Sequence, residues 1–85
     1  MLKVGSKVQH ESEDGKGFIT RKTGVVTWID KSLATPSGCV IVEITHIRCE
    51  HKNHPELGRD LPVPQVEYGR LIAFDAEECE EINDA

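Results

Sequence analysis

The sequence has few aromatic residues and no long apolar run. Its 85 residues include one Trp, one Tyr and two Phe. A core must take some of these rings, so a base-stacking platform or a methyl-lysine cage is difficult to build. Trp28 and Tyr68 are the best candidates for such a surface, although for Trp28 we favour a place in the core. The apolar stretches are too short to cross a bilayer and no signal-peptide core follows Met1, so we expect a cytoplasmic protein without membrane contact.

Catalytic signatures are also missing. The cysteines, Cys39, Cys49 and Cys79, are an odd and widely spaced set, which is typical of reduced thiols and not of a disulfide framework. No Gly-x-Ser-x-Gly, His-Glu-x-x-His or Walker sequence is present. We therefore predict a protein that is not an enzyme and uses no cofactor, and we keep a zinc- or thiol-dependent enzyme as the third hypothesis.

One segment, residues 49–54 (Cys-Glu-His-Lys-Asn-His), concentrates residue types that bind zinc. Cys49, His51 and His54 are the candidate ligands. Further ligands would come from Cys39, His46 or Cys79. The spacing is not that of a standard zinc knuckle, and no Cys-x-x-Cys pair exists. We therefore predict no metal site, and we interpret His51 and His54 as exposed residues of a polar loop.

Basic residues are outnumbered, and the imbalance is local. The chain has 10 Lys and Arg against 15 Asp and Glu, a formal net charge of −5. Segment 75–85 holds six carboxylates and no base, so residues 1–74 carry +1. A protein-wide basic footprint for nucleic acid is therefore absent. Acidic segments of this kind maintain solubility or contact a basic partner. The candidate contact residues are Glu77, Glu78, Glu80 and Glu81.

Short runs of β-favouring residues between Gly- and Pro-containing turns predict a single all-β domain over residues 1–85. Strands are expected at residues 2–10, 24–30, 39–47 and 66–74, with a shorter one at 18–20. Closing four or five antiparallel strands into a small barrel or roll would remove exposed edges. In the second strand, alternation assigns Val26 and Trp28 to one face.

Two further segments are expected to be irregular or helical. Residues 48–65 carry three of the four prolines, which predicts a long loop, and loops of this length are often functional. Asp75 and Glu78 have the spacing of a capping box, which predicts a short helical turn through about Ile82.

The order of these strands resembles a known family. Gly5-Ser6-Lys7-Val8, then residues 23–30 (Thr-Gly-Val-Val-Thr-Trp-Ile-Asp), then residues 40–44 (Val-Ile-Val-Glu-Ile), are similar to the KOW-type SH3-like barrel. The resemblance covers about residues 4–46. It implies an SH3-like barrel, with roles in transcription elongation or ribosomal RNA contact. Two departures from the family are the acidic residues after Val8 and the acidic C-terminal half.

These observations support three hypotheses of function. The leading one is a protein–protein interaction module that uses the 48–65 loop, with His51 and His54, and the acidic C-terminal segment to bind a basic protein. The alternative is nucleic-acid or ribonucleoprotein binding of KOW type through a basic N-terminal face. That face would consist of Lys7, Lys16, Arg21 and Lys22. Oligomeric state stays open, and a homodimer would compensate for the thin core of so short a chain.

Overall fold

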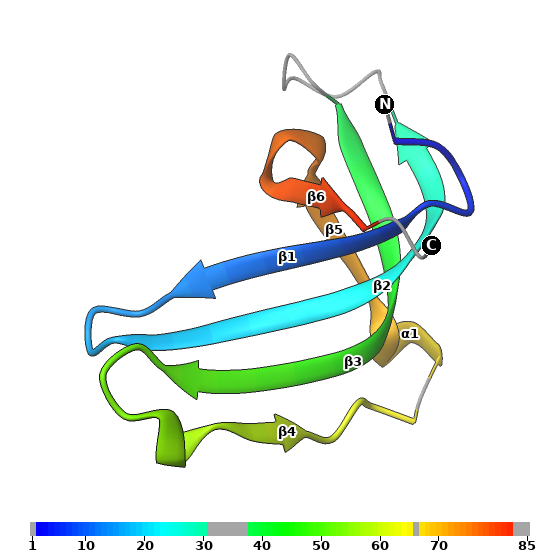
Figure 1. Cartoon of the computed structure of the whole chain (residues 1–85). Coiled ribbons are helices and arrows are strands. Elements are labelled where there is room, and N and C mark those ends of the chain that lie inside the picture. Colours follow the sequence, from blue (N-terminus) through cyan, green and yellow to red (C-terminus); the bar gives the residue numbers. More distant parts are fainter. Residues whose placement is uncertain (1, 31–37, 66, 83–85) are drawn as a thin grey trace.

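The computed structural model describes residues 2–30, 38–65 and 67–82, and these form one antiparallel sheet of six strands (Figure 1). The strands are β1 (Lys7–Glu13), β2 (Phe18–Asp30), β3 (Cys39–His51), β4 (Arg59–Leu61), β5 (Leu71–Asp75) and β6 (Cys79–Glu81). Their order is β4-β3-β2-β1-β6, and β5 pairs with β3. The helical segments are η1 (Pro55–Leu57), α1 (Glu67–Arg70) and η2 (Ala76–Glu78). The predicted all-β fold is confirmed.

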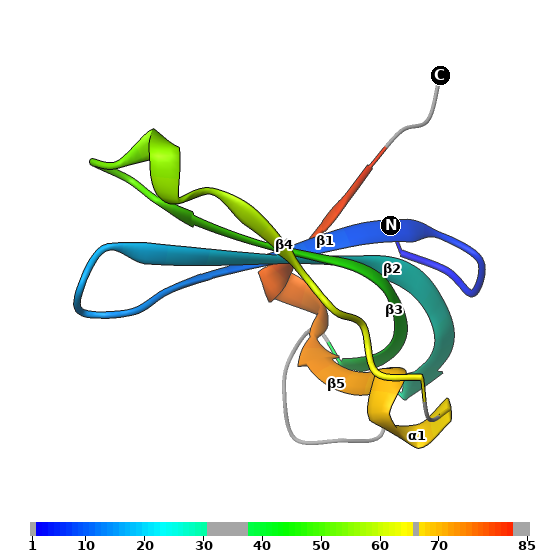
Figure 2. The ribbon, with the colours of Figure 1, turned by 90° about the horizontal axis from the view of Figure 1, so that it is seen from below.

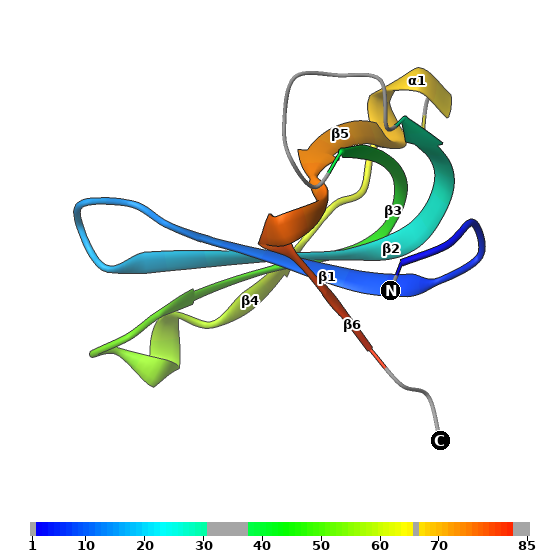
Figure 3. The same cartoon turned by 90° about the horizontal axis from the view of Figure 1, so that it is seen from above.

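The sheet is built on β2 and β3, which are each 13 residues long and pair along their whole length. Seen along the sheet, both strands run straight at one end and curl strongly at the other, around β5 and α1 (Figures 2 and 3). Their register shifts twice, between Thr23 and Gly24 and between Val26 and Trp28. β-Bulges of this kind bend a strand and increase its twist. We infer that these two irregularities produce the curl.

The hydrophobic core lies inside the curled end. It consists of Val8, Val26, Val40, Val42, Ile44 and Phe74. All but Phe74 are only 1% exposed. Because side chains alternate along a strand, these residues place one face of β1, β2, β3 and β5 toward the core. We call this the core face and the opposite one the outer face.

The straight end is a ribbon formed by β1, the first half of β2, the second half of β3 and β4, and it is longer than predicted. In these strand segments, only Val8 and Gly24 are buried. Residues 11–13 and 18–23 belong to strands, although we predicted a loop from residue 11 to residue 17 and a separate short strand at 18–20. Polar residues on both faces of the ribbon hide the alternation that identifies a strand.

Other element predictions were wrong in detail. Residues 48–65 are not a long loop, because β3 continues to His51 and is followed by η1 and β4. The expected strand at 66–74 begins with α1 and becomes β5 at Leu71. Asp75 does cap a helical turn, since its Oδ1 accepts the Glu77 N–H at 3.1 Å, but that turn is the three-residue η2. The chain then enters β6, and the predicted helix through Ile82 is absent from the described residues.

Candidate functional site

The outer face of the curled end carries an exposed tryptophan. Trp28 is 62% exposed, so its predicted place in the core was wrong. The reason is the second register shift, which leaves Thr27 without a partner between Val26 and Trp28. The Thr27 hydroxyl donates to the Ile41 carbonyl at 3.2 Å and holds this bulge. One extra residue reverses the alternation, so Val26 faces the core and Trp28 faces outward.

Apolar side chains surround Trp28 on this face. Trp28 pairs across the sheet with Ile41, which pairs with Ala73 of β5. In the neighbouring row, Glu43 of β3 pairs with Val25 of β2 on one side and with Leu71 of β5 on the other. Ala73 is exposed, whereas Ile41, Val25 and Leu71 are partly exposed. We call Trp28, Ile41, Ala73, Val25 and Leu71 the outer apolar patch.

The acidic segment joins the sheet as its edge. β6 pairs with β1, with Glu80 opposite Gln9 and Cys79 opposite His10. His10 stacks on Phe74 at a centroid distance of 4.2 Å, and its Nε2 lies 3.3 Å from Glu78 Oε2. η2 and β6 are thereby held against the core. The predicted contact residues Glu77, Glu78, Glu80 and Glu81 are all exposed.

Carboxylates continue from this edge across the outer face of the ribbon. Glu80 shares a row with Gln9, Thr23 and His46, and the next row contains Glu11, Arg21, Arg48 and Asp60. Arg21 bonds to Glu11 and Glu50, and Arg48 bonds to Asp60 at 3.1 Å. The hydrogen bonds from Arg48 and His46 lower the pKa of Asp60 below its usual value. The arginines on this face are therefore already paired with carboxylates.

The residues of the predicted basic face are separated by the fold. Lys7 and Arg21 lie on the outer face, with Glu11 next to Arg21. Lys22 follows Arg21 in the strand and therefore lies on the opposite face. Lys16 lies in the β1–β2 turn, between two strands that end at Glu13 and begin at Phe18. The structure thus distributes these four residues over two faces and a turn.

The predicted contact residues His51 and His54 lie at the far end of the ribbon. The His51 ring packs on Phe18 and His54, with centroid distances of 4.8 Å to each. Its Nδ1 accepts the Asn53 N–H, so its Nε2 carries the proton and donates to the Lys16 carbonyl at 2.9 Å. His51 therefore joins the two turns of the ribbon, whereas His54 lies 3.2 Å from Glu56 and has an exposed side chain.

The described residues do not form a metal centre, and the thiol of Cys79 is not activated. No group of three or more His, Cys, Asp or Glu side chains is arranged to hold a metal ion among residues 2–30, 38–65 and 67–82. Burial, together with Glu78 and Asp75, raises the pKa of the Cys79 thiol, so this sulfur stays protonated and is a weak nucleophile. None of the described helices is long and apolar enough to span a membrane.

No protein-family model, curated protein or solved structure matches this chain. The outer apolar patch was missed because alternation alone assigns Trp28 to the core. The sequence did contain an indication of this patch. In residues 25–29 (Val-Val-Thr-Trp-Ile), apolar side chains occur at both odd and even positions, and therefore on both faces of the strand. The side chain of Tyr68, the second candidate for an aromatic surface, lies outside the described part of the structure.

Proposed function

We propose that this protein is a non-catalytic binding module that recognises a basic protein surface with its outer face. The observation that carries the proposal is the 62% exposure of Trp28 in the outer apolar patch. An apolar patch of this kind on a small domain is typical of an interaction surface. Tryptophan is also enriched among the few residues that dominate the free energy of protein–protein binding.

The charge around the patch supports a basic partner. Glu43 lies in the row next to Trp28, and Glu80 lies two rows away on the same face. Farther along the ribbon, the carboxylates of Glu11, Glu13, Glu50 and Asp60 are paired with Arg21, Lys52 and Arg48, so the negative charge nearest the patch comes from Glu43 and Glu80. A partner that places an apolar cavity over the indole would meet carboxylates on the ribbon side of it. Complementary charge of this sort raises the association rate and selects the orientation of binding.

The test is affinity capture from extracts of the native host, with and without nuclease, using the wild-type protein and two matched variants. Trp28→Ser removes the exposed indole, and Leu57→Ser removes another exposed apolar side chain, 46% exposed, at the far end of the ribbon. We expect Trp28→Ser to raise the dissociation constant for a captured protein by roughly 30-fold or more, which corresponds to a loss of about 2 kcal/mol in binding free energy. Leu57→Ser should bind like the wild type.

Two results would contradict the proposal. One is equal capture by Trp28→Ser and the wild type, after thermal unfolding has shown that both are folded. The other is loss of all capture on nuclease treatment. That second result would favour the alternative proposal, nucleic-acid binding through Lys7, Lys16, Arg21 and Lys22, which a steep salt dependence of RNA binding would identify.

A further inference from the structure

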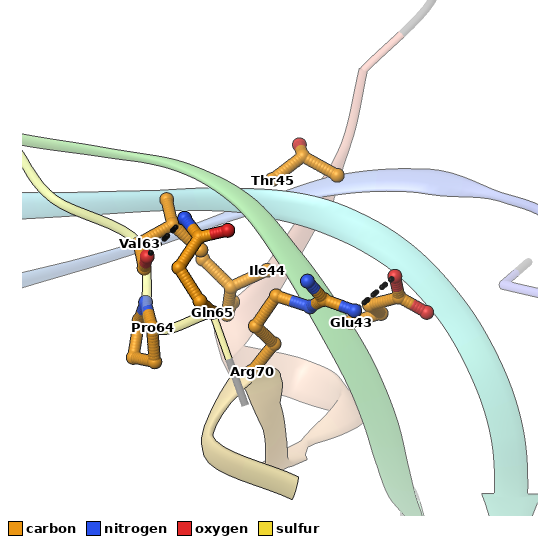
Figure 4. Close-up of a pocket in the computed structure, with 7 residues that line it drawn as sticks. All are labelled: Glu43, Ile44, Thr45, Val63, Pro64, Gln65 and Arg70. Atoms are coloured by element: carbon orange, nitrogen blue, oxygen red, sulfur yellow. Dashed lines mark hydrogen bonds and ion pairs between the residues drawn. The ribbon is translucent and has the colours of Figure 1, made fainter. Parts of the chain in front are cut away.

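A pocket with a volume of about 330 Å³ opens at the edge of β3, beside the outer apolar patch (Figure 4). It lies between residues 43–45 of β3, residues 63–65 and the side chain of Arg70. Its volume is at the lower end of the range of about 300–1,000 Å³ typical of small-molecule sites. A ligand of one or two amino-acid residues therefore matches its size.

The pocket exists because β3 lacks a strand partner here. On the edge away from β2, β5 pairs with Cys39–Glu43 and β4 pairs with Ile47–Cys49. Residues 44–46 lie between these two ladders. Apart from their pairing with β2, these residues make no backbone hydrogen bond to another described residue. Unpaired backbone on a strand edge is a template for an extended segment of another molecule.

Arg70 supplies a positive group with unused hydrogen-bonding capacity. It ends α1, and Leu71 next to it pairs with Glu43, so its backbone is fixed. Its Nη2 lies 3.8 Å from Glu43 Oε1, which is too far for a hydrogen bond. Its Nε is buried and has no hydrogen-bond partner among the described residues. The guanidinium is a rigid fork of donors that suits a carboxylate, and here that fork is not saturated.

The other walls supply an apolar contact and an acceptor. Val63 and Pro64 form one side of the pocket and offer the apolar contact, whereas Ile44 lines it from β3 with its side chain buried in the core. Gln65 lines the pocket together with Arg70, and its Nε2 donates to the Val63 carbonyl at 3.3 Å (Figure 4). The Oε1 atom of Gln65 is then left to accept a hydrogen bond from a ligand amide.

We propose that this pocket binds an α-carboxylate whose carbon carries a small apolar side chain and an amide, as at the carboxyl end of a peptide. The carboxylate pairs with the guanidinium of Arg70 and the side chain contacts Val63 and Pro64. The amide of the ligand meets Gln65 and the open edge of β3. Glu43 weakens binding of the ligand, because its carboxylate competes for the guanidinium of Arg70.

The test is a titration of the full-length, isotopically labelled protein followed by NMR amide shifts. The probes are N-acetyl-L-valine, its neutral analogue N-acetyl-L-valinamide, and the peptide acetyl-Gly-Gly-Val with a free carboxylate. We expect the acid to shift amides of residues 43–46 and 65, and the neutral analogue to bind at least roughly tenfold more weakly, as for loss of one charge-assisted contact. Tighter binding of the peptide than of the acetyl amino acid assigns the site to peptide ends, and equal binding assigns it to small free acids.

Three variants test whether Arg70 is the group that binds the carboxylate. Arg70→Gln should remove the preference for the acid over the neutral analogue, while Arg59→Gln, a matched change at an exposed arginine of β4, should preserve it. Glu43→Gln leaves Arg70 in place and should tighten binding of the acid. Equal binding of acid and neutral analogue, or an unchanged preference in folded Arg70→Gln, would overturn the proposal. These results are independent of Trp28→Ser, so the pocket and the outer apolar patch can fail separately.

Discussion

Single residues decide where this sheet bends. Gly24 is the sharpest case, because a Cβ at this position would lie 2.3 Å from the Glu43 carbonyl oxygen and 2.7 Å from a methyl carbon of Val42. Backbone at that distance cannot move aside without disrupting the β2–β3 ladder. The glycine thus permits the close approach of two strands at the first bulge, next to the core residue Ile44.

We predict that Gly24→Ala destabilises the protein by about 3 kcal/mol, at the upper end of what overpacking usually costs. The matched control is Gly15→Ala, because a Cβ there meets no atom within 4 Å. The control should be neutral or stabilising by up to about 1 kcal/mol, since it restricts only the unfolded chain. Urea unfolding of the three proteins measures both changes. Similar stability of the two variants would show that the strands separate freely at Gly24.

The β1–β2 turn depends on one carboxylate. Asp14 Oδ1 accepts the Lys16 N–H at 2.8 Å and the Phe18 N–H at 3.0 Å. These hydrogen bonds, that of Lys16 first, hold the pKa of Asp14 below its usual value. A lowered pKa in the folded state means that the ionised carboxylate stabilises the fold above its unfolded-state pKa. This stabilisation is lost as the pH falls through the folded-state pKa.

For Asp14→Asn we therefore expect a lower melting temperature than wild type at pH 7, and a difference that shrinks between about pH 5 and pH 3. Melting curves by circular dichroism across this range measure it. Glu80→Gln, an exposed change on β6, controls for the general loss of a negative charge. A constant difference between Asp14→Asn and wild type at every pH would exclude ionisation of Asp14 as its cause.

At the scale of elements, the sequence predicted what depends on local pattern. The alternating valines of β3 and the β-favouring run of β2 were recognised, as was the Asp75 cap. Trp28 was assigned to the wrong face, because it follows a bulge and a one-residue insertion reverses every later side chain. Ile47 follows the other bulge, and it packs against the core.

The candidate sites were harder to predict than the strands. The apolar row of Trp28, Ile41 and Ala73 requires the cross-strand register, which no local pattern contains. The pocket beside Arg70 requires the gap between two ladders on one edge of β3. The spread of Lys16, Arg21 and Lys22 over a turn and two faces also became visible only with the register. Both candidate sites depend on pairing between segments distant in sequence, which composition and periodicity do not specify.

The whole molecule is uneven in its stabilisation. It measures 41 × 28 × 28 Å, and its core residues lie at the curled end. The ribbon is held by its backbone ladder and by exposed ion pairs such as Lys52 with Glu13 at 2.9 Å. Exposed pairs of this kind contribute at most about 1 kcal/mol each. The ribbon should therefore open locally while the curled end stays folded.

We predict that native-state hydrogen exchange separates these two parts. Amides of Val26 and of Val40–Ile44, beside the core, should exchange only on global unfolding. Amides near the turns of the ribbon, such as Phe18 and Lys52, should exchange more than about tenfold faster.

Ile44→Ala, which removes a buried side chain and should cost about 2–5 kcal/mol, must then accelerate the slow group and leave the fast group nearly unchanged. If both groups accelerated equally, the ribbon and the curled end would be one cooperative unit. The ribbon's ladder and ion pairs would then hold it as firmly as the core holds the curled end.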